Sequence, residues 1–213
     1  MNAAARSEAH TWDALANRYD VIVRMFDRSY PRVRELLRED LRGCRTALEV
    51  SAGTGQFTAV LAEVVEALVA SDVSPNMVAQ LRTRLHDAGV TNTDVEVMNA
   101  YALSADTGVF DAVICANALH VMEQPSQALR EFRRVLVPGG NLIVPTFLHG
   151  ANRSRRVLSR ALSMVSPFVA HTRFELATLE SLVESEGFII ERAERLPGLF
   201  PIGYVKARVG DRA

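Results

Sequence analysis

The chain has 213 residues, of which 48% are hydrophobic and 23% charged, and its formal net charge is −1. This composition suits one globular domain with a substantial core, and the near-zero charge gives no general reason to expect nucleic acid or an anionic membrane as a partner. No stretch approaches the roughly 20 apolar residues of a membrane-spanning helix, and no apolar targeting segment is seen, so we expect a cytoplasmic protein. The two cysteines, Cys44 and Cys115, are unclustered and predict no metal site.

Helices are predicted first, over residues 11–42, where apolar side chains recur at helical spacing. Pro31 suits the first turn of a helix, because its missing N–H costs nothing there. A short apolar run at 46–50 then ends in small residues at 51–55 and is followed by a helical pattern from Phe57. This order predicts a strand, a tight turn and a helix.

The strand–helix alternation repeats through the middle of the chain. We predict further strands at 67–72, 95–98, 110–116 and 141–147, and helices at 75–86 and 125–137. Ser74 fits the N-cap of the first of these helices and Pro75 its first residue. Repeated units of this kind predict an α/β fold in which a parallel sheet has helices on both faces.

The last third of the chain departs from this alternation. It contains a helical pattern over 153–169, a second helix over 176–186 that ends at Gly187, and strands at 188–190 and 204–209. We see neither an internal repeat nor a linker. The sequence therefore predicts a single domain.

The glycine-rich turn at 51–55 is the segment most informative about function. Such a turn lets the backbone approach a ligand closely and points a helix N-terminus at it. Thr58 stands where a dinucleotide-binding turn has its third glycine, so that pattern is incomplete. Asp72 ends the second strand 19 residues after Gly53, where doubly wound folds place a carboxylate for ribose hydroxyls. Taken alone, the two features also fit a tight connection and the start of a turn.

Four sequence blocks together resemble one family. They are Leu48-Glu49-Val50 with Gly53-Thr54-Gly55, Ser71-Asp72-Val73-Ser74-Pro75-Asn76-Met77, Phe110-Asp111-Ala112-Val113, and Arg134-Val135-Leu136-Val137-Pro138-Gly139-Gly140. In this order and spacing, residues 19 to 208 resemble the class I S-adenosylmethionine-dependent methyltransferases. The resemblance implies S-adenosylmethionine as cofactor. It also implies a Rossmann-like, doubly wound, mostly parallel seven-stranded sheet with an antiparallel C-terminal strand.

The resemblance also implies cofactor-binding residues at the strand ends. Along the methionine part it places Glu49, Ser51, Ala52, Gly53, Gly55 and Asn117. Along the adenosine it places Asp72, Val73, Met77, Asn99 and Ala100. Within these groups, Asp72 would accept bonds from the ribose hydroxyls, Asn99 would meet the adenine edge and Glu49 would approach the methionine amino group. Tyr19, in a Tyr-Asp pair like that of the family's N-terminal lid, is a candidate for cofactor binding and for catalysis.

Two departures from the family pattern bear on activity. Ser51 and Ala52 replace what is commonly Gly-Cys or Gly-Ser, and because Ser51 carries a Cβ we expect either a negative φ or a strained backbone. Asn99 stands where the family often has Asp, which keeps an acceptor but removes a charge. These departures leave open a non-catalytic relative that binds the cofactor.

Methyl transfer from a sulfonium is an in-line displacement, for which the protein aligns the reactants and excludes water. His120 is the only imidazole predicted at the core strand ends, so it is the candidate base if the acceptor must lose a proton. The same residue also fits a structural histidine. Substrate choice is expected to come from the segments outside the common core.

We therefore predict one methyltransferase domain over 1–213. Its parts are an N-terminal helical lid (1–42), a cofactor-binding core (43–147), a helical substrate cap (148–177), and a C-terminal helix with a strand pair (178–213). The expected reaction moves a methyl group to an O, N or S atom of a small, partly apolar acceptor.

Three other functions would also fit parts of the sequence. Arginines within 153–160 support a lipid-directed enzyme in peripheral contact with a membrane surface, and the departures above support a non-catalytic relative. The incomplete glycine pattern disfavours an NAD-dependent oxidoreductase. Nucleic acid is not expected, because no dense basic patch carries interleaved aromatics. The sequence sets no oligomeric state.

Overall fold

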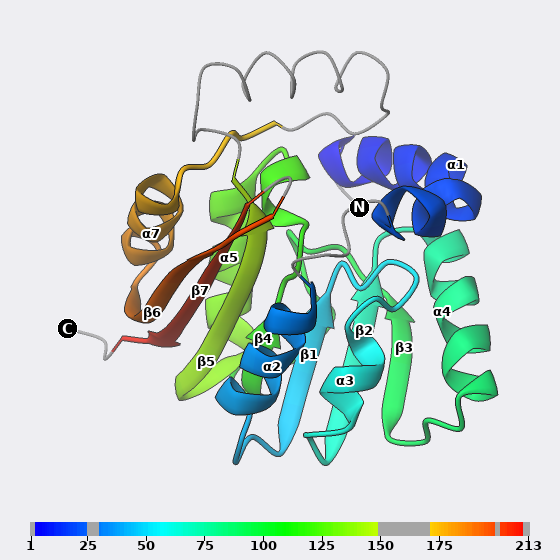
Figure 1. Cartoon of the computed structure of the whole chain (residues 1–213), viewed down its shortest axis with the longest axis horizontal. Helices are drawn as coiled ribbons and strands as arrows, with labels where there is room; N and C mark the ends of the chain where they lie inside the picture. The colour runs from blue at the N-terminus through cyan, green and yellow to red at the C-terminus, as the bar shows by residue number, and fades with distance from the viewer. Residues whose placement is uncertain (1–2, 25–29, 149–170, 199–200, 211–213) are drawn as a thin grey trace.

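A seven-stranded sheet in the order β3-β2-β1-β4-β5-β7-β6 forms the centre of the molecule (Figure 1). The computed structural model describes residues 3–24, 30–148, 171–198 and 201–210. The strands are β1 (Thr46–Val50), β2 (Ala67–Asp72), β3 (Thr93–Val97), β4 (Phe110–Ile114), β5 (Leu136–Phe147), β6 (Phe188–Leu196) and β7 (Ile202–Val209). The first five are parallel, whereas β7 runs antiparallel to both β5 and β6. The predicted Rossmann-like fold class is confirmed.

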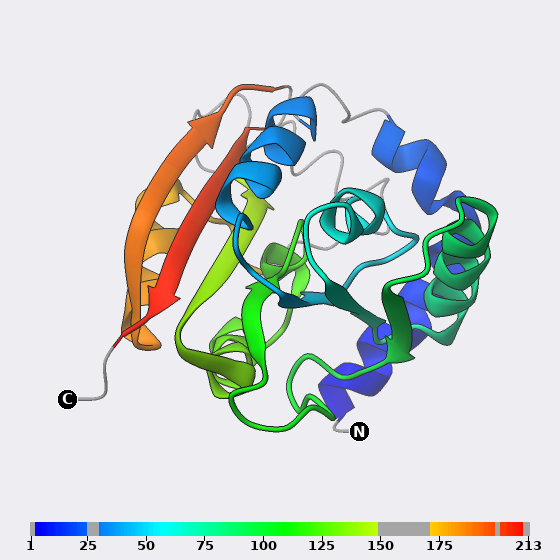
Figure 2. The same cartoon turned by 90° about the horizontal axis from the view of Figure 1, so that it is seen from below.

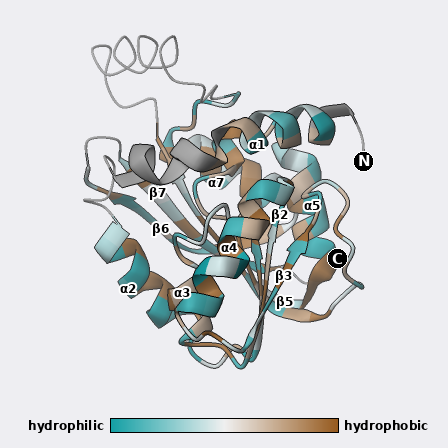
Figure 3. Ribbon diagram, turned by 90° about the vertical axis from the view of Figure 1, so that its right-hand side faces the viewer, coloured by the Kyte–Doolittle hydropathy of each residue, from teal (hydrophilic) through white to brown (hydrophobic). Residues whose placement is uncertain are grey.

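Helices cover both faces of this sheet (Figure 2). They are α1 (Ala3–Arg24), α2 (Tyr30–Asp40), α3 (Thr58–Ala62), α4 (Pro75–Asp87), the 3-10 turn η2 (Leu119–Val121), α5 (Pro125–Val135) and α7 (Leu176–Ser185). Successive strand residues face opposite sides, so Val113 packs with α5 and α7, whereas Ile114 packs with α2 and α3. Hydrophobic residues concentrate on the central strands, between helices of mixed polarity (Figure 3). The core strands are therefore buried on both faces, as expected for a parallel sheet.

The strand order reverses at β1, which pairs with β2 on one side and with β4 on the other. At such a switch point, the connections leaving the two neighbouring strands run to opposite faces of the sheet and open a crevice at the carboxyl ends. The glycine-rich turn and the ends of β2 and β4 all meet at this crevice. The strand order alone therefore brings the glycine-rich turn, Asp72 and Asn117 to the same crevice.

Most predicted elements are found within a few residues of their expected bounds. The predicted helix over 11–42 is two helices, α1 and α2, with Pro31 in the first turn of α2 as expected. Ser74 is the N-cap of α4, and its hydroxyl accepts a hydrogen bond from the N–H of Met77 at 3.1 Å. The helix predicted over 153–169, and most of the predicted substrate cap, lie outside the described residues.

The start of β5 differs from the prediction, which placed it at residue 141 because of the Pro-Gly-Gly segment. Leu136 already pairs with Phe110, and regular pairing resumes at Asn141 with Ala112 after a shift in register. Gly139 has φ 73°, so it supplies a left-handed residue within the irregularity. Proline and glycine here mark a bulge in a continuous strand.

None of the described helices is long and apolar enough to cross a membrane.

Candidate functional site

A cavity lies at the carboxyl ends of β1, β2 and β4, where the strand order reverses. It holds about 290 Å³ of space, part of it open to solvent. It is lined by Trp12, Ser51, Gly53, Asp72, Ala116, Asn117, Ala118 and Val121. Ser51, Gly53, Asp72 and Asn117 are residues that the sequence predicted for the site. Trp12, from α1, adds an aromatic wall from outside the alternating core.

The turn after β1 is held by unusual backbone conformations. Ser51 has φ 57°, so the expectation of a negative φ is wrong and the strained alternative applies. A left-handed conformation costs a residue with a Cβ roughly 1–2 kcal/mol. Gly55 has φ 93°, and a Cβ there would lie 2.5 Å from Cδ1 of Leu81 on α4. A side chain at this position would therefore be strained by the dihedral angle and would displace the Leu81 side chain.

Asp72 ties the end of β2 to this turn. Its Oδ2 accepts a hydrogen bond from the N–H of Gly53 and its Oδ1 one from the N–H of Ser74, both at 2.9 Å. Burial raises the pKa of this carboxyl to about 6, although the backbone donors act in the opposite direction. Among the described residues, the carboxylate is thus held in place by backbone N–H groups.

Glu49 is a second buried carboxyl group, one strand away on β1. The Thr58 hydroxyl donates to its Oε2 at 2.6 Å, which links β1 to the start of α3. Burial raises the pKa of Glu49 to about 8, and the negative charge of Asp72 adds to the rise. Neither carboxyl group has an arginine, lysine or histidine partner among the described residues. The site is therefore suited to a ligand that carries positive charge.

Asn117 follows β4 and faces the same cavity. Its backbone is left-handed at φ 53°, a conformation that asparagine tolerates better than most residues, and its N–H donates to the carbonyl of Pro145 at 2.7 Å. The side-chain Nδ2 donates to the hydroxyl of Tyr30 at 3.1 Å. Tyr30, at the start of α2, was missed by the sequence analysis, where the only local signal was its place before Pro31.

The predicted adenine-binding residues lie around the ends of β2 and β3. Asn99 uses Oδ1 to accept a hydrogen bond from the N–H of Tyr101 at 3.0 Å. Val73 is half-buried, whereas Met77 and Ala100 are buried, as is Ala52 in the turn. None of these five lines the cavity just described. Their contact with the cofactor stays a prediction.

Of the two catalytic candidates, His120 and Tyr19, the structure describes the side chain of His120 only. His120 is buried in η2, with Nδ1 at 3.0 Å from the Thr146 hydroxyl at the end of β5 and its ring edge-on to Phe147 at 5.6 Å. It does not line the cavity, and its role as a base stays a prediction. Tyr19 lies in α1, but its side chain is outside the described residues. Within the described part of the chain, no cluster of His, Cys, Asp or Glu could hold a metal ion.

Helix α1 is attached to this edge of the core by two carboxylates, which the sequence analysis did not anticipate. Glu8 accepts a hydrogen bond from the Tyr101 hydroxyl at 2.5 Å. Asp13 accepts one from the N–H of Asn76 at 3.1 Å and another from the hydroxyl of Ser74. These contacts hold α1 across the end of β2 and the start of α4 (Figure 1). They place it where a cover for the cavity would lie.

Comparisons with known proteins agree with this geometry. Residues 48–144 match a family model described as a methyltransferase domain. A ubiquinone/menaquinone biosynthesis C-methyltransferase of Escherichia fergusonii is 31% identical over 146 residues, which is 65% of this chain and 58% of that protein. The chain thus matches little more than half the length of this curated relative.

Two solved structures share the fold. One is an S-adenosylmethionine-dependent methyltransferase from Aquifex aeolicus, with a TM-score of 0.67 and 18% identity over 83% of this chain and 89% of that one. The other is a protein of the same description from Methanosarcina mazei, with a TM-score of 0.69 and 19% identity over 83% and 98%.

Proposed function

We propose that the chain is a class I S-adenosylmethionine-dependent methyltransferase and that it transfers a methyl group to an O, N or S atom of a small, partly apolar acceptor. The observation that carries this proposal is the cavity at the switch point, which is lined by Asp72 at the end of β2 and by Asn117 after β4. S-adenosylmethionine is the cofactor of this family, and it carries a sulfonium and an ammonium group. Its positive charge fits a site with two buried carboxyl groups that have no cationic side-chain partner among the described residues.

The residues present can hold such a cofactor and prepare the transfer. Asp72, fixed by two backbone N–H groups, would accept hydrogen bonds from ribose hydroxyls, and Glu49 would offset positive charge on the methionine side. When bound, S-adenosylmethionine supplies an electrophilic methyl group on its sulfonium. Trp12 and α1 would exclude water from that group. Positioning and water exclusion of this kind supply much of the rate acceleration in such displacements.

The walls around Asn117 support the partly apolar acceptor. Ala116, Ala118 and Val121 line the cavity beside it, and Trp12 faces it from α1. A carbon acceptor on an aromatic ring is a second candidate, because the curated relatives are named C-methyltransferases. A hydroxyl or ring-carbon acceptor loses a proton in the reaction, and His120 is the base we propose for that step.

The test uses the whole protein. Isothermal titration calorimetry should detect S-adenosylhomocysteine binding in the micromolar range, about −8 kcal/mol, and no comparable binding of NAD. Mass spectrometry of acceptor pools, incubated with S-adenosylmethionine, should then reveal a product heavier by one methyl group. Failure to bind either form of the cofactor would overturn the proposal. Binding without transfer to any pool, quinone precursors and lipids included, would indicate the non-catalytic relative.

A further inference from the structure

The carboxamide of Asn117 has one satisfied end and one unsatisfied end. Nδ2 donates to the Tyr30 hydroxyl at 3.1 Å. Oδ1 is buried, yet it has no hydrogen-bond partner among the described residues. Buried acceptors are nearly always paired, because leaving one unmet forfeits its bonds to water. Because Asn117 lines the cavity, its unmet acceptor indicates a donor on the ligand.

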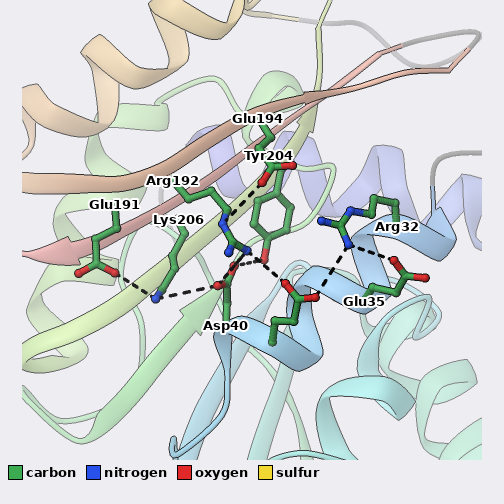
Figure 4. A network of polar contacts seen from close by, with 9 residues as sticks. Arg32, Glu35, Asp40, Glu191, Arg192, Glu194, Tyr204 and Lys206 are labelled. Atoms are coloured by element: carbon green, nitrogen blue, oxygen red, sulfur yellow. Dashed lines mark hydrogen bonds and ion pairs between the residues drawn. The ribbon is translucent and has the colours of Figure 1, made fainter.

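The position of Tyr30 is fixed independently of Asn117. Its side chain is 1% exposed, and its ring packs edge-on against Phe57 with centroids 5.3 Å apart. The opposite end of α2 is anchored to the sheet, because Asp40 accepts a hydrogen bond from the Tyr204 hydroxyl at 2.8 Å and pairs with Arg192 at 3.1 Å (Figure 4). The Tyr30 hydroxyl is thus a fixed point against which the amide can orient.

We propose that Tyr30 is a positioning residue, which turns the Asn117 amide so that Oδ1 faces the cavity and accepts a hydrogen bond from the cofactor's α-ammonium group. This inference rests on the proposed function. A flipped amide would present its NH2 group to the ammonium and set donor against donor. With Nδ2 held by Tyr30, the acceptor faces the charge.

The layout of the sheet favours the ammonium as the donor. Asp72 ends β2 and Asn117 follows β4, with β1 and its glycine-rich turn between them. A cofactor whose ribose lies at Asp72 would cross the end of β1 and bring its methionine part to Asn117. The adenosine part would remain on the β2 side, out of reach of Oδ1.

The experiment compares two ligands that differ in the amino-acid group. S-adenosylhomocysteine has the α-ammonium, whereas 5′-methylthioadenosine keeps the adenosine and the sulfur but lacks the amino acid. By calorimetry, Tyr30→Phe should weaken S-adenosylhomocysteine about tenfold and leave 5′-methylthioadenosine within about twofold of wild type. Equal losses for both ligands, or no loss for either, would overturn the assignment.

A double variant separates orientation from packing. In Asn117→Asp either oxygen can accept, so affinity should no longer depend on Tyr30, and adding Tyr30→Phe should cost less than about twofold. A tenfold loss that persists in this background would overturn the proposal. Tyr204→Phe is the matched control: it also removes a buried hydroxyl, but Arg192 still holds Asp40, so thermal stability should fall without a change in affinity.

Two further outcomes are decisive. If Tyr30→Phe does not fold, Asn117→Gly replaces it, because glycine accepts the left-handed backbone and removes the acceptor; this variant must weaken S-adenosylhomocysteine and spare 5′-methylthioadenosine. If the wild-type protein binds no S-adenosylhomocysteine, the proposed function fails together with this assignment. If the wild type binds it and Tyr30→Phe binds it equally well, only the assignment fails.

Discussion

Two regions of the molecule bury carboxylates in opposite ways. On the α2 side of the sheet, the Asp40 side chain is 7% exposed and is surrounded by the Arg192 guanidinium, the Lys206 ammonium and the Tyr204 hydroxyl (Figure 4). At the switch point, Asp72 and Glu49 are also buried, but their hydrogen bonds come from backbone N–H groups and a threonine hydroxyl. Among the described residues, the first region offsets its negative charge with cationic side chains and the second does not.

This difference separates a structural network from a ligand site. Removing a charge from water is costly unless a partner offsets it, so an unbalanced buried pair lowers stability. The raised pKa values of Glu49 and Asp72 express that cost, since burial shifts both groups toward the neutral form. A cationic ligand would offset it. If the proposed function holds, the switch point is less stable than the α2 network but binds the positively charged cofactor more tightly for that reason.

The largest effect is expected when Asp72 is removed. Asp72→Ala should weaken S-adenosylhomocysteine by about 30-fold or more, because charge-assisted hydrogen bonds contribute about 1.5–3 kcal/mol each. Calorimetry measures this loss, and Asp72→Asn, which keeps one acceptor oxygen, should lose less. The matched control is Asp40→Asn, which should lower the melting temperature and leave affinity unchanged. If Asp40→Asn weakened the affinity as much as Asp72→Ala, the two regions would not differ in ligand binding.

A second effect should appear in the pH dependence of stability without cofactor. The pKa of Glu49 is about 8 in the folded protein, against an ordinary value of 4.5, so the native state binds more protons between these values. The free energy of unfolding should therefore fall as pH rises from about 4.5 to about 8, by a few kcal/mol. Asp72, with a pKa raised from 3.8 to about 6, adds to the fall over its lower range.

Glu49→Gln tests the glutamate's share of this fall. The amide is neutral at every pH and keeps an oxygen for the Thr58 hydroxyl, so the variant should be more stable than wild type at pH 8 and similar to it at pH 5. Urea denaturation at both pH values measures the difference. Glu184→Gln, at an exposed position on α7, should keep the wild-type slope. If the free energy of unfolding changed with pH equally in wild type and Glu49→Gln, a group other than Glu49 would cause the fall.

Local signals were sufficient for much of the fold and part of the site. Strand β2 and helix α4 were predicted from an apolar run, an N-cap serine and a first-turn proline, all within about twenty residues of one another. The glycine-rich turn and Asp72 were predicted because their spacing reflects one strand–turn–helix unit and the next strand. The antiparallel pairing of β7 came from the family resemblance alone.

Side-chain contacts between segments far apart in the sequence could not be predicted from the sequence. Tyr30 and Asn117 are separated by 87 residues, and Glu8 and Tyr101 by 93. A polar side chain carries no periodic signal that names its partner, so such pairs emerge only once the sheet is assembled. The left-handed backbone of Ser51 is similar: the strain it stores is supported by the surrounding turn, which single-residue preferences do not describe.

The smallest effect is expected at the attachment of α1, where Glu8 and Asp13 lie nearer the surface than the carboxylates at the switch point. Burial raises the pKa of Glu8, but its hydrogen bonds to Tyr101 and to the N–H of Glu123 act against that rise. Each attachment joins α1 to the core without touching the cavity directly. Losing one should therefore change how readily α1 opens, and should leave the bound ligand's contacts intact.

Asp13→Asn and Glu8→Gln should accordingly speed the release of S-adenosylhomocysteine about threefold each, with little change in its association rate, since one partly exposed hydrogen bond contributes about 0.5–1.5 kcal/mol. Stopped-flow displacement measures both rates. Thr11→Ala removes a hydroxyl that donates to the carbonyl of Ser7 within α1, so this variant should release the ligand at the wild-type rate. Deleting residues 1–18 removes both attachments together with Trp12, so turnover should fall more than affinity. Full activity of that truncated chain would show that α1 is no cover, because the reacting methyl group would then need no protection from this side.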